Sequence, residues 1–165
     1  MDGNKGTVNY EVYTDASFAC RQKERKSTTG YCIKMAGACI SWSSSKQGSI
    51  ALSTTESEII ALSEGLKESE WFYHILKELG FVHKLPIQVW CDSHGAIATC
   101  TNPGNHKSTK HIETRYLFGR DLIEKGRIKV DYLHTSRMIA DCITRALTGQ
   151  AYESLRNGMG IKQLS

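Results

Sequence analysis

The sequence has only two prolines, and it has no apolar run that approaches the roughly 18 residues of a membrane-spanning helix. Residues 1–8 are polar, so they lack the apolar segment of a secretion signal. These absences argue against a membrane protein and against a secreted one. We therefore expect a soluble protein inside the cell, with no membrane among its partners.

The scarcity of proline also argues against a disordered chain, as do the 40% hydrophobic and 23% charged residues. A chain of 165 residues is long enough for one hydrophobic core and short for two. Neither an internal repeat nor a linker-like segment interrupts the sequence. The expectation is a single globular domain over residues 1–165.

The chain also lacks a strong excess of charge, because its formal net charge at pH 7 is only +4. This weak excess does not by itself indicate a nucleic-acid partner. Basic residues do cluster at 21–26 and at 107–111. Both clusters suit contact with phosphates, although a solvated loop is the favoured interpretation of any single cluster.

The six cysteines include no Cys-x-x-Cys pair. An even number suits disulfides, but nothing else in the sequence indicates secretion, so we expect reduced, mostly buried thiols. Cys100, His106 and His111 are conceivable zinc ligands, but their spacing matches no standard zinc motif. Zinc binding is therefore a disfavoured alternative.

Hydrophobic periodicity predicts the strands. Apolar residues alternate over 8–12 and predict a strand that ends near Asp15. Residues 31–35 and 39–42 predict two further strands joined by a tight turn at Ala36-Gly37. The remaining expected strands cover 87–91 and 128–133.

A long helix is expected between Ser53 and Gly80. Ser53 and Glu56 form a capping-box pattern, and a glycine commonly follows a helix end. Its apolar stripe comprises Ile59, Leu62, Leu66, Tyr73 and Leu76. Shorter helices are expected over 95–100, 111–124, 139–147 and 152–159. This order predicts an α/β fold in which three antiparallel strands precede strands that run parallel to a neighbour.

Four carboxylates occupy distinctive positions in these elements. Asp15 and Asp92 lie where strands end, which is where open α/β sheets carry their sites, whereas Glu58 and Asp141 lie early in helices. If the two strands are neighbours, the aspartates approach each other, and clustered like charges require a cation. Carboxylate oxygens suit Mg²⁺ or Mn²⁺, and two such ions fit the cleavage of a phosphodiester.

Each of these carboxylates has a structural alternative. A strand-end aspartate often only caps a turn. Glu56 competes with Glu58 for the position on the long helix, but the capping box already gives Glu56 a local role. Because the two side chains point to different faces of the helix, we choose Glu58.

Several stretches of the chain become recognisable when they are taken together and in order. They are 25–31, 40–42, 46–47, 51–58, 91–92, 102–103, 110–112 and 139–141 with Thr144. With these stretches the chain resembles, over nearly its whole length, the ribonuclease H domain of copia-type retrotransposon polyproteins. Residues 57–62 also look like the Ala-Glu-Leu-Ile-Ala-Leu form of related retroviral domains, which favours Glu58 over Glu56.

The resemblance implies a ribonuclease H-like fold, a five-stranded mixed sheet flanked by helices. It implies an endonuclease that hydrolyses the RNA strand of RNA–DNA hybrids during reverse transcription, in the cytoplasm, beside the reverse transcriptase domain of the same polyprotein. It also implies two Mg²⁺ ions, replaceable by Mn²⁺, and no small-molecule cofactor. The catalytic metal ligands that it implies are Asp15, Glu58, Asp92 and Asp141.

The chain departs from the family pattern at a few positions. Residues 15–20 read Asp-Ala-Ser-Phe-Ala-Cys, where copia-type domains usually read Asp-Ala-Asp-Trp-Ala-Gly. Leu117 and Ser93 replace a histidine and an asparagine that are common in the family. These changes bear on substrate fit more than on the chemistry.

Further candidates lie near the four carboxylates. His134 is a possible helper in product release, although a strand-end role is favoured for it. The hydroxyls of Thr14, Ser17 and Ser93 are candidate contacts to 2′-hydroxyls or phosphates, or else ordinary turn hydroxyls.

Lys107 and Lys110 are candidate contacts to the phosphates of the DNA strand. Trp42, Trp71 and Trp90 are expected in the core, because each lies within an apolar segment.

Two other functions compete with the nuclease. One is a catalytically weak or retired module kept for nucleic-acid binding or protein assembly, against which the presence of all four carboxylates argues. The other is a different enzyme of the same fold, such as a DNA-cutting resolvase or an exonuclease. The family-like stretches outside the candidate site argue against this second rival.

Overall fold

The computed structural model describes residues 6–19, 26–102, 104, 108–162 and 164. Arg21, Lys23, Arg25, His106 and Lys107, which the sequence singled out, lie outside the described residues. Among the described helices, none is both long enough and apolar enough to cross a membrane.

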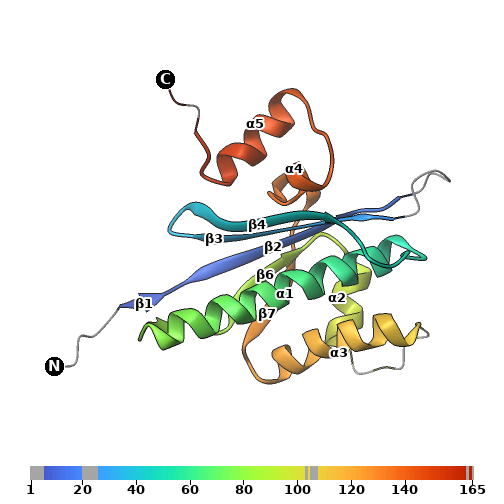
Figure 1. Ribbon diagram of the computed structural model, residues 1–165, viewed down its shortest axis with the longest axis horizontal. Helices are drawn as coiled ribbons and strands as arrows, with labels where there is room; N and C mark the ends of the chain where they lie inside the picture. The colour runs from blue at the N-terminus through green and yellow to red at the C-terminus, as the bar shows by residue number, and fades with distance from the viewer. Residues whose placement is uncertain (1–5, 20–25, 103, 105–107, 163, 165) are drawn as a thin grey trace.

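A five-stranded mixed sheet forms the centre of the molecule, as predicted (Figure 1). Its strands, in spatial order, are β4 (Ala38–Lys46), β3 (Thr28–Met35), β2 (Tyr10–Ser17), β6 (Ile87–Cys91) and β7 (Ile128–Tyr132). Strand β3 is antiparallel to both β2 and β4, whereas β6 runs parallel to β2 and β7 runs parallel to β6.

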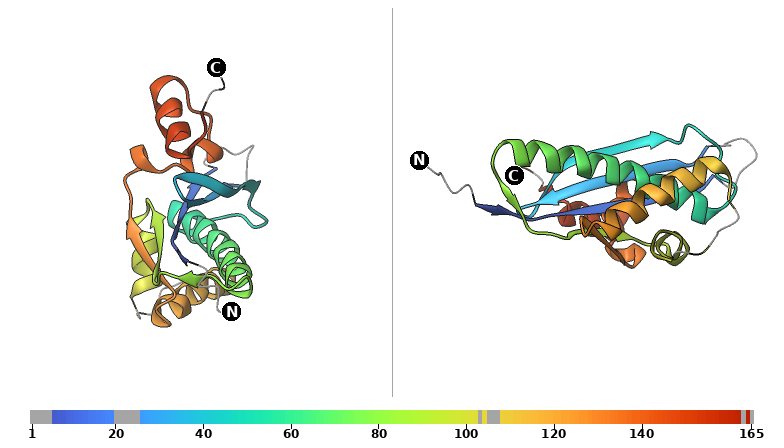
Figure 2. Two further views of the ribbon diagram at one scale, coloured as in Figure 1. Left: turned by 90° about the vertical axis from the view of Figure 1, so that its left-hand side faces the viewer. Right: turned by 90° about the horizontal axis from the view of Figure 1, so that it is seen from below.

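Helices cover both faces of the sheet (Figure 2). One face carries α1 (Thr54–Glu78), α2 (His94–Thr101) and α3 (Lys110–Glu124), packed over a core that includes Val12, Leu66 and Val89. The other face carries α4 (Asp141–Thr144) and α5 (Gly149–Gly158), over a second core that includes Tyr13 and Met138. Alternate side chains of β2 therefore contribute to opposite cores.

The long helix α1 begins and ends as its sequence predicts. The Oγ of Ser53 accepts a hydrogen bond from the backbone N–H of Glu56 (3.1 Å), and the Glu56 carboxylate accepts one from the N–H of Leu52 (2.7 Å). Gly80 follows the helix with a φ of +85°, a conformation that favours glycine. The five residues of the predicted apolar stripe are all buried.

Several elements differ from the prediction. The expected helix over 139–147 is only α4, because the backbone becomes extended at Arg145 (φ −144°, ψ 156°). The last helix begins at Gly149 rather than at Tyr152. Strand β2, by contrast, ends at Ser17, so Asp15 lies near the end of a strand as predicted.

Two short strands and one helical turn were not predicted. Strands β1 (Thr7–Val8) and β5 (Val82–His83) form a separate two-stranded parallel sheet. These dipeptides carry too little pattern to predict a strand, and each depends on its partner. The helical turn is η1 (Thr135–Arg137).

The tryptophan prediction is wrong for two of the three residues. Trp42 is 62% exposed because it lies on the edge strand β4, and Trp71 is 58% exposed on the outer surface of α1. Trp90 is half-buried against the core under α4 and α5. An apolar segment does not reveal which of its side chains faces solvent.

The cysteine prediction is wrong for one pair. Cys32 and Cys39 form a disulfide, because the antiparallel pairing of β3 with β4 brings their Cα atoms to 6.2 Å. The expectation of free thiols is confirmed for Cys91 and Cys100, which are buried, and for the partly buried Cys142.

The close approach of α1 to the sheet yields a first prediction. A Cβ atom at Gly65 would lie 2.6 Å from Cγ2 of Thr14, a fully buried side chain. We expect Gly65→Val to lower the free energy of unfolding by about 1–3 kcal/mol, the usual effect of overpacking a core. Urea denaturation measures this change. Gly48→Val is the control, because a Cβ there meets nothing within 4 Å; equal loss in both variants would contradict the prediction.

Candidate active site

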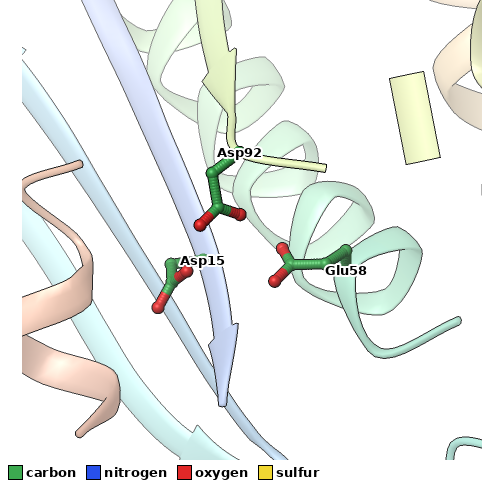
Figure 3. A group of neighbouring side chains, drawn as sticks. All are labelled: Asp15, Glu58 and Asp92. Carbon is green, nitrogen blue, oxygen red and sulfur yellow. The ribbon is translucent and has the colours of Figure 1, made fainter. Parts of the chain in front are cut away.

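Three carboxylates from three different elements meet at one end of the sheet (Figure 3). Asp15 lies in β2, Glu58 lies in the second turn of α1, and Asp92 directly follows β6. One oxygen of each carboxylate lies within 4.8 Å of the others. The parallel register of β2 and β6 pairs Thr14 with Cys91. The residues that follow these two in the sequence, Asp15 and Asp92, therefore lie at the same edge of the sheet.

Asp15 is almost completely buried, at 1% exposure. Its Oδ2 accepts a hydrogen bond from the Oγ1 of Thr144, whereas its Oδ1 has no hydrogen-bond partner among the described residues. Burial raises the pKa of Asp15 to about 6; the Thr144 hydrogen bond opposes this rise, and the charges of Asp92 and Asp141 add to it. A buried carboxylate with an unpaired oxygen is suited to bind a cation.

Glu58 is also buried, and it reaches toward the two aspartates. Its Oε1 accepts a hydrogen bond from the backbone N–H of Ala16 (3.2 Å), and its Oε2 has no hydrogen-bond partner in the part of the chain that the structure describes. Burial, followed by the charges of Asp15 and Asp92, raises the pKa of Glu58 to about 9. The competing Glu56 caps the helix, so the structure separates the two glutamates as the sequence predicted.

Asp92 is partly buried, and its Oδ2 accepts a hydrogen bond from the Oγ1 of Thr135 (3.1 Å). Asp141 is buried as the first residue of α4, but it is not one of the three clustered carboxylates. Asp141 forms an ion pair with Arg145, whose Nε donates a hydrogen bond to Oδ1 of Asp141. The charge of Asp141 nevertheless contributes to the raised pKa of Asp15.

Two predicted hydroxyl contacts have structural partners. The Oγ1 of Thr14 donates to the backbone carbonyl of Trp90 (3.2 Å), and the Oγ of Ser93 caps α2 by accepting from the N–H of Ala96 (3.2 Å). Ser17 ends β2 and is partly buried. Of the two lysines, Lys110 is exposed at the start of α3 and Lys107 lies outside the described residues.

His134 is exposed and caps the turn η1. Its Nδ1 lies 2.9 Å from the Oγ of Ser136 and accepts from the Ser136 backbone N–H at 3.2 Å. The next residue, Thr135, is the one that bonds to Asp92. The arrangement fits the favoured strand-end role and keeps His134 beside the candidate site.

Sequence reasoning missed Thr135, Thr144 and Arg145 as partners of the carboxylates. Thr144 was part of a recognised stretch, and Arg145 lies four residues after Asp141, which is the spacing of a helical ion pair. These two signals were available. Nothing in the sequence indicated that Thr135 contacts Asp92 from 43 residues away.

The donor set fits a hard divalent cation and does not fit zinc. Three carboxylates with two unpaired buried oxygens match the oxygen ligands that Mg²⁺ and Mn²⁺ prefer. Among the conceivable zinc ligands in the described chain, Cys100 is buried in the core and His111 lies 2.9 Å from the Oγ of Ser49. The described residues therefore offer no support for a zinc site there.

Comparison with known proteins identifies relatives among transposons. The chain is 39% identical over 149 residues to the retrovirus-related Pol polyprotein from transposon TNT 1-94 of Nicotiana tabacum, a match that covers 90% of the chain. It is 32% identical over 158 residues to the corresponding polyprotein of transposon RE1 of Arabidopsis thaliana, which covers 96% of the chain. The chain is a homologue of transposon Pol polyproteins. No protein-family model matches it.

Solved structures show the same fold at low sequence identity. The N-terminal ribonuclease H domain of a Mycobacterium tuberculosis protein superposes with a TM-score of 0.61 at 16% identity, covering 91% of this chain and 97% of that one. LC11-RNase H1, solved in complex with an RNA/DNA hybrid, has a TM-score of 0.61 at 14% identity, covering 82% and 93%. The fold is that of ribonuclease H.

The chain thus has the predicted fold. Its predicted resemblance to the ribonuclease H domain of retrotransposon polyproteins is confirmed. Fold and homology together identify a ribonuclease H-like domain in a homologue of transposon Pol polyproteins. The match spans only 11% of the length of the two Pol polyproteins.

The buried carboxylates lead to a second prediction, on the metal-free protein. A carboxyl whose pKa is raised on folding contributes most stability below its ordinary pKa and loses it as pH rises through the raised value. Because the pKa values of Asp15 and Glu58 rise to about 6 and about 9, stability in a chelator should fall between roughly pH 4 and pH 9.

At pH 8 in the chelator, Glu58→Gln should therefore melt at least about 3 °C above the wild type, a shift that corresponds to roughly 1 kcal/mol in a domain of this size. Glu56→Gln is the matched control, since it leaves the cluster intact. Thermal unfolding followed by circular dichroism measures both variants. A lower melting temperature for Glu58→Gln than for the wild type would contradict the buried-charge argument.

Proposed function

We propose that the chain is a metal-dependent endonuclease that hydrolyses the RNA strand of RNA–DNA hybrids. The observation that carries the proposal is the meeting of Asp15, Glu58 and Asp92 within 4.8 Å on a ribonuclease H fold. Homology to Pol polyproteins supports a role in reverse transcription. The hybrid bound by LC11-RNase H1, a structural neighbour, supports the choice of substrate.

In this proposal Asp15, Glu58 and Asp92 hold one divalent ion, and Asp15 with Asp141 holds a second. When bound, such ions polarise the scissile phosphate, stabilise the leaving oxygen and lower the pKa of an attacking water. Mg²⁺ is the expected ion, with Mn²⁺ as a substitute. The products carry 5′-phosphate and 3′-hydroxyl ends.

The chain's own contribution is to hold the carboxylates ready. Thr144 fixes one oxygen of Asp15, the backbone N–H of Ala16 fixes one oxygen of Glu58, and Thr135 fixes one oxygen of Asp92. Each of these donors leaves the second oxygen of its carboxylate for a cation. Partners of this kind orient metal ligands, so less reorganisation is needed when the ion binds.

Substrate contacts follow from charge and position. Lys110, exposed at the start of α3, is proposed to contact phosphates of the DNA strand, as is Lys107. Among the hydroxyls, Ser17 at the end of β2 is the better candidate, because Thr14 and Ser93 already serve the backbone. The reverse transcriptase of the same polyprotein is the proposed protein partner, and a cytoplasmic reverse-transcription complex is the proposed location.

The third prediction tests the activity itself. An end-labelled RNA–DNA hybrid, double-stranded DNA and single-stranded RNA are incubated with the protein in Mg²⁺ or Mn²⁺. We expect cleavage of RNA in the hybrid alone, and a rate roughly a hundredfold or more lower for Asp92→Asn, since the loss of about 3 kcal/mol of transition-state stabilisation has this effect.

Asp121→Asn is the matched control, because it removes an exposed aspartate from α3, away from the site. Cleavage that is unchanged in Asp92→Asn would refute the assignment of the site. An intact hybrid that is nevertheless bound by the wild type, measured by fluorescence anisotropy, would refute independent catalysis and favour the retired binding module.

A further inference from the structure

Two consecutive residues at the end of the short helix α4 donate hydrogen bonds to two of the four carboxylates. Thr144 donates its hydroxyl to Oδ2 of Asp15, and Arg145 donates its Nε to Oδ1 of Asp141. Helix α4 packs on β2, β3 and β4, and a Cβ at Gly30, the β3 partner of Asp15, would lie 2.5 Å from Cγ2 of Thr144. The turn is thus held firmly against the strand that carries Asp15.

The positive charge of Arg145 also acts on the three clustered carboxylates. Its guanidinium lowers the pKa values of both Asp15 and Glu58, against the larger effect of their burial. Burial disfavours its own charged form, yet the hydrogen bond and charge of Asp141, followed by the charges of Asp15 and Asp92, raise the pKa of Arg145. Arg145 therefore contacts Asp141 directly and acts on the other three carboxylates through its charge alone.

We propose that Arg145 is the counter-ion of the metal-free carboxylates and that it competes with a divalent cation for Asp141. The inference rests on the proposed function, in which Asp141 helps to hold the second ion. Arg145 is in this sense a positioning residue, since it acts on the site through Asp141. Binding of the second ion requires that the guanidinium release Oδ1 of Asp141.

The burial of the two partners indicates which one moves. The Asp141 side chain is 6% exposed and is anchored in the packed turn, whereas the Arg145 side chain is 48% exposed. The backbone of Arg145 is already extended beyond the end of α4. The guanidinium can therefore swing into solvent while the carboxylate stays, and repulsion from an arriving dication favours that movement.

A second ion pair of the same spacing shows what a merely helical contact looks like. Lys125 and Asp121 on α3 also lie four residues apart, but their side chains are 62% and 53% exposed. A pair this exposed contributes little to stability. It therefore supplies a control with the same loss of one positive charge.

The fourth prediction is that Arg145→Gln binds Mn²⁺ more tightly than the wild type. Free Mn²⁺ is measured by its electron paramagnetic resonance signal during titration of the whole chain at low ionic strength. The weaker of two Mn²⁺ sites should have a dissociation constant about twofold to fivefold lower in Arg145→Gln, the scale of a partly exposed charge pair. The difference should shrink at 1 M salt.

Thermal unfolding provides a second readout. In a chelator Arg145→Gln should melt below the wild type, because the carboxylates lose their counter-ion, and saturating Mn²⁺ should close the gap. Lys125→Gln should match the wild type in both measurements. Arg145→Lys keeps the charge without the Nε donor, so it should lie between the wild type and Arg145→Gln, and it serves if the glutamine variant does not fold.

The outcomes separate the two proposals. If Arg145→Gln or Arg145→Lys binds Mn²⁺ with unchanged or lower affinity at the weaker site, the competition by Arg145 is refuted while the metal-dependent nuclease stands. If neither the wild type nor any variant binds Mn²⁺, the metal-dependent function fails, and the inference fails with it. Asp141→Asn should abolish the weaker site in both backgrounds; its persistence would refute the role given to Asp141.

Discussion

Parallel hydrogen bonding between β2 and β6 places Thr14 opposite Cys91, and this register carries Asp15 and Asp92 to one edge of the sheet. Two carboxylates brought together in this way repel each other, and burial of Asp15 increases the energetic cost. Glu58 adds a third negative charge from α1. The hydrogen-bond donors and the cation around the site act on this repulsion between carboxylates.

Neutral hydrogen-bond donors contact the three clustered carboxylates, and one cation, Arg145, lies beside them. Two threonine hydroxyls and one backbone N–H each occupy one carboxylate oxygen. None of these donors neutralises charge, so the raised pKa values of Asp15 and Glu58 persist. The full positive charge of Arg145 is placed on Asp141, outside the three clustered carboxylates. The centre is thereby kept available for a cation from solution.

The comparison with solved ribonucleases H shows that chains of low sequence identity share this fold. Identity to the structural neighbours is only 14–16%, yet the fold superposes over most of both chains. The sheet order and the packing of α1 against it depend on alternating apolar residues that many sequences supply. The carboxylate cluster, by contrast, depends on three particular residues, Asp15, Glu58 and Asp92.

The sequence by itself determined the elements with strong local signals. The capping residues Ser53 and Glu56 and the stripe from Ile59 to Leu76 specified α1. Short apolar runs, alternation and a turn signal specified the strands of the sheet. The choice of Glu58 over Glu56 also followed from local chemistry. These features were predictable because caps and periodicity act between residues only a few positions apart.

Only the tertiary structure decided which side chains meet across long separations. Thr144 reaches Asp15 from 129 residues away, Thr135 reaches Asp92, and the hairpin joins Cys32 to Cys39. The exposure of Trp42 depends on β4 being the edge strand, which no property of its own segment reveals. Contacts of this kind depend on strand order and register, and these are set by the packing of the whole chain rather than by neighbouring residues.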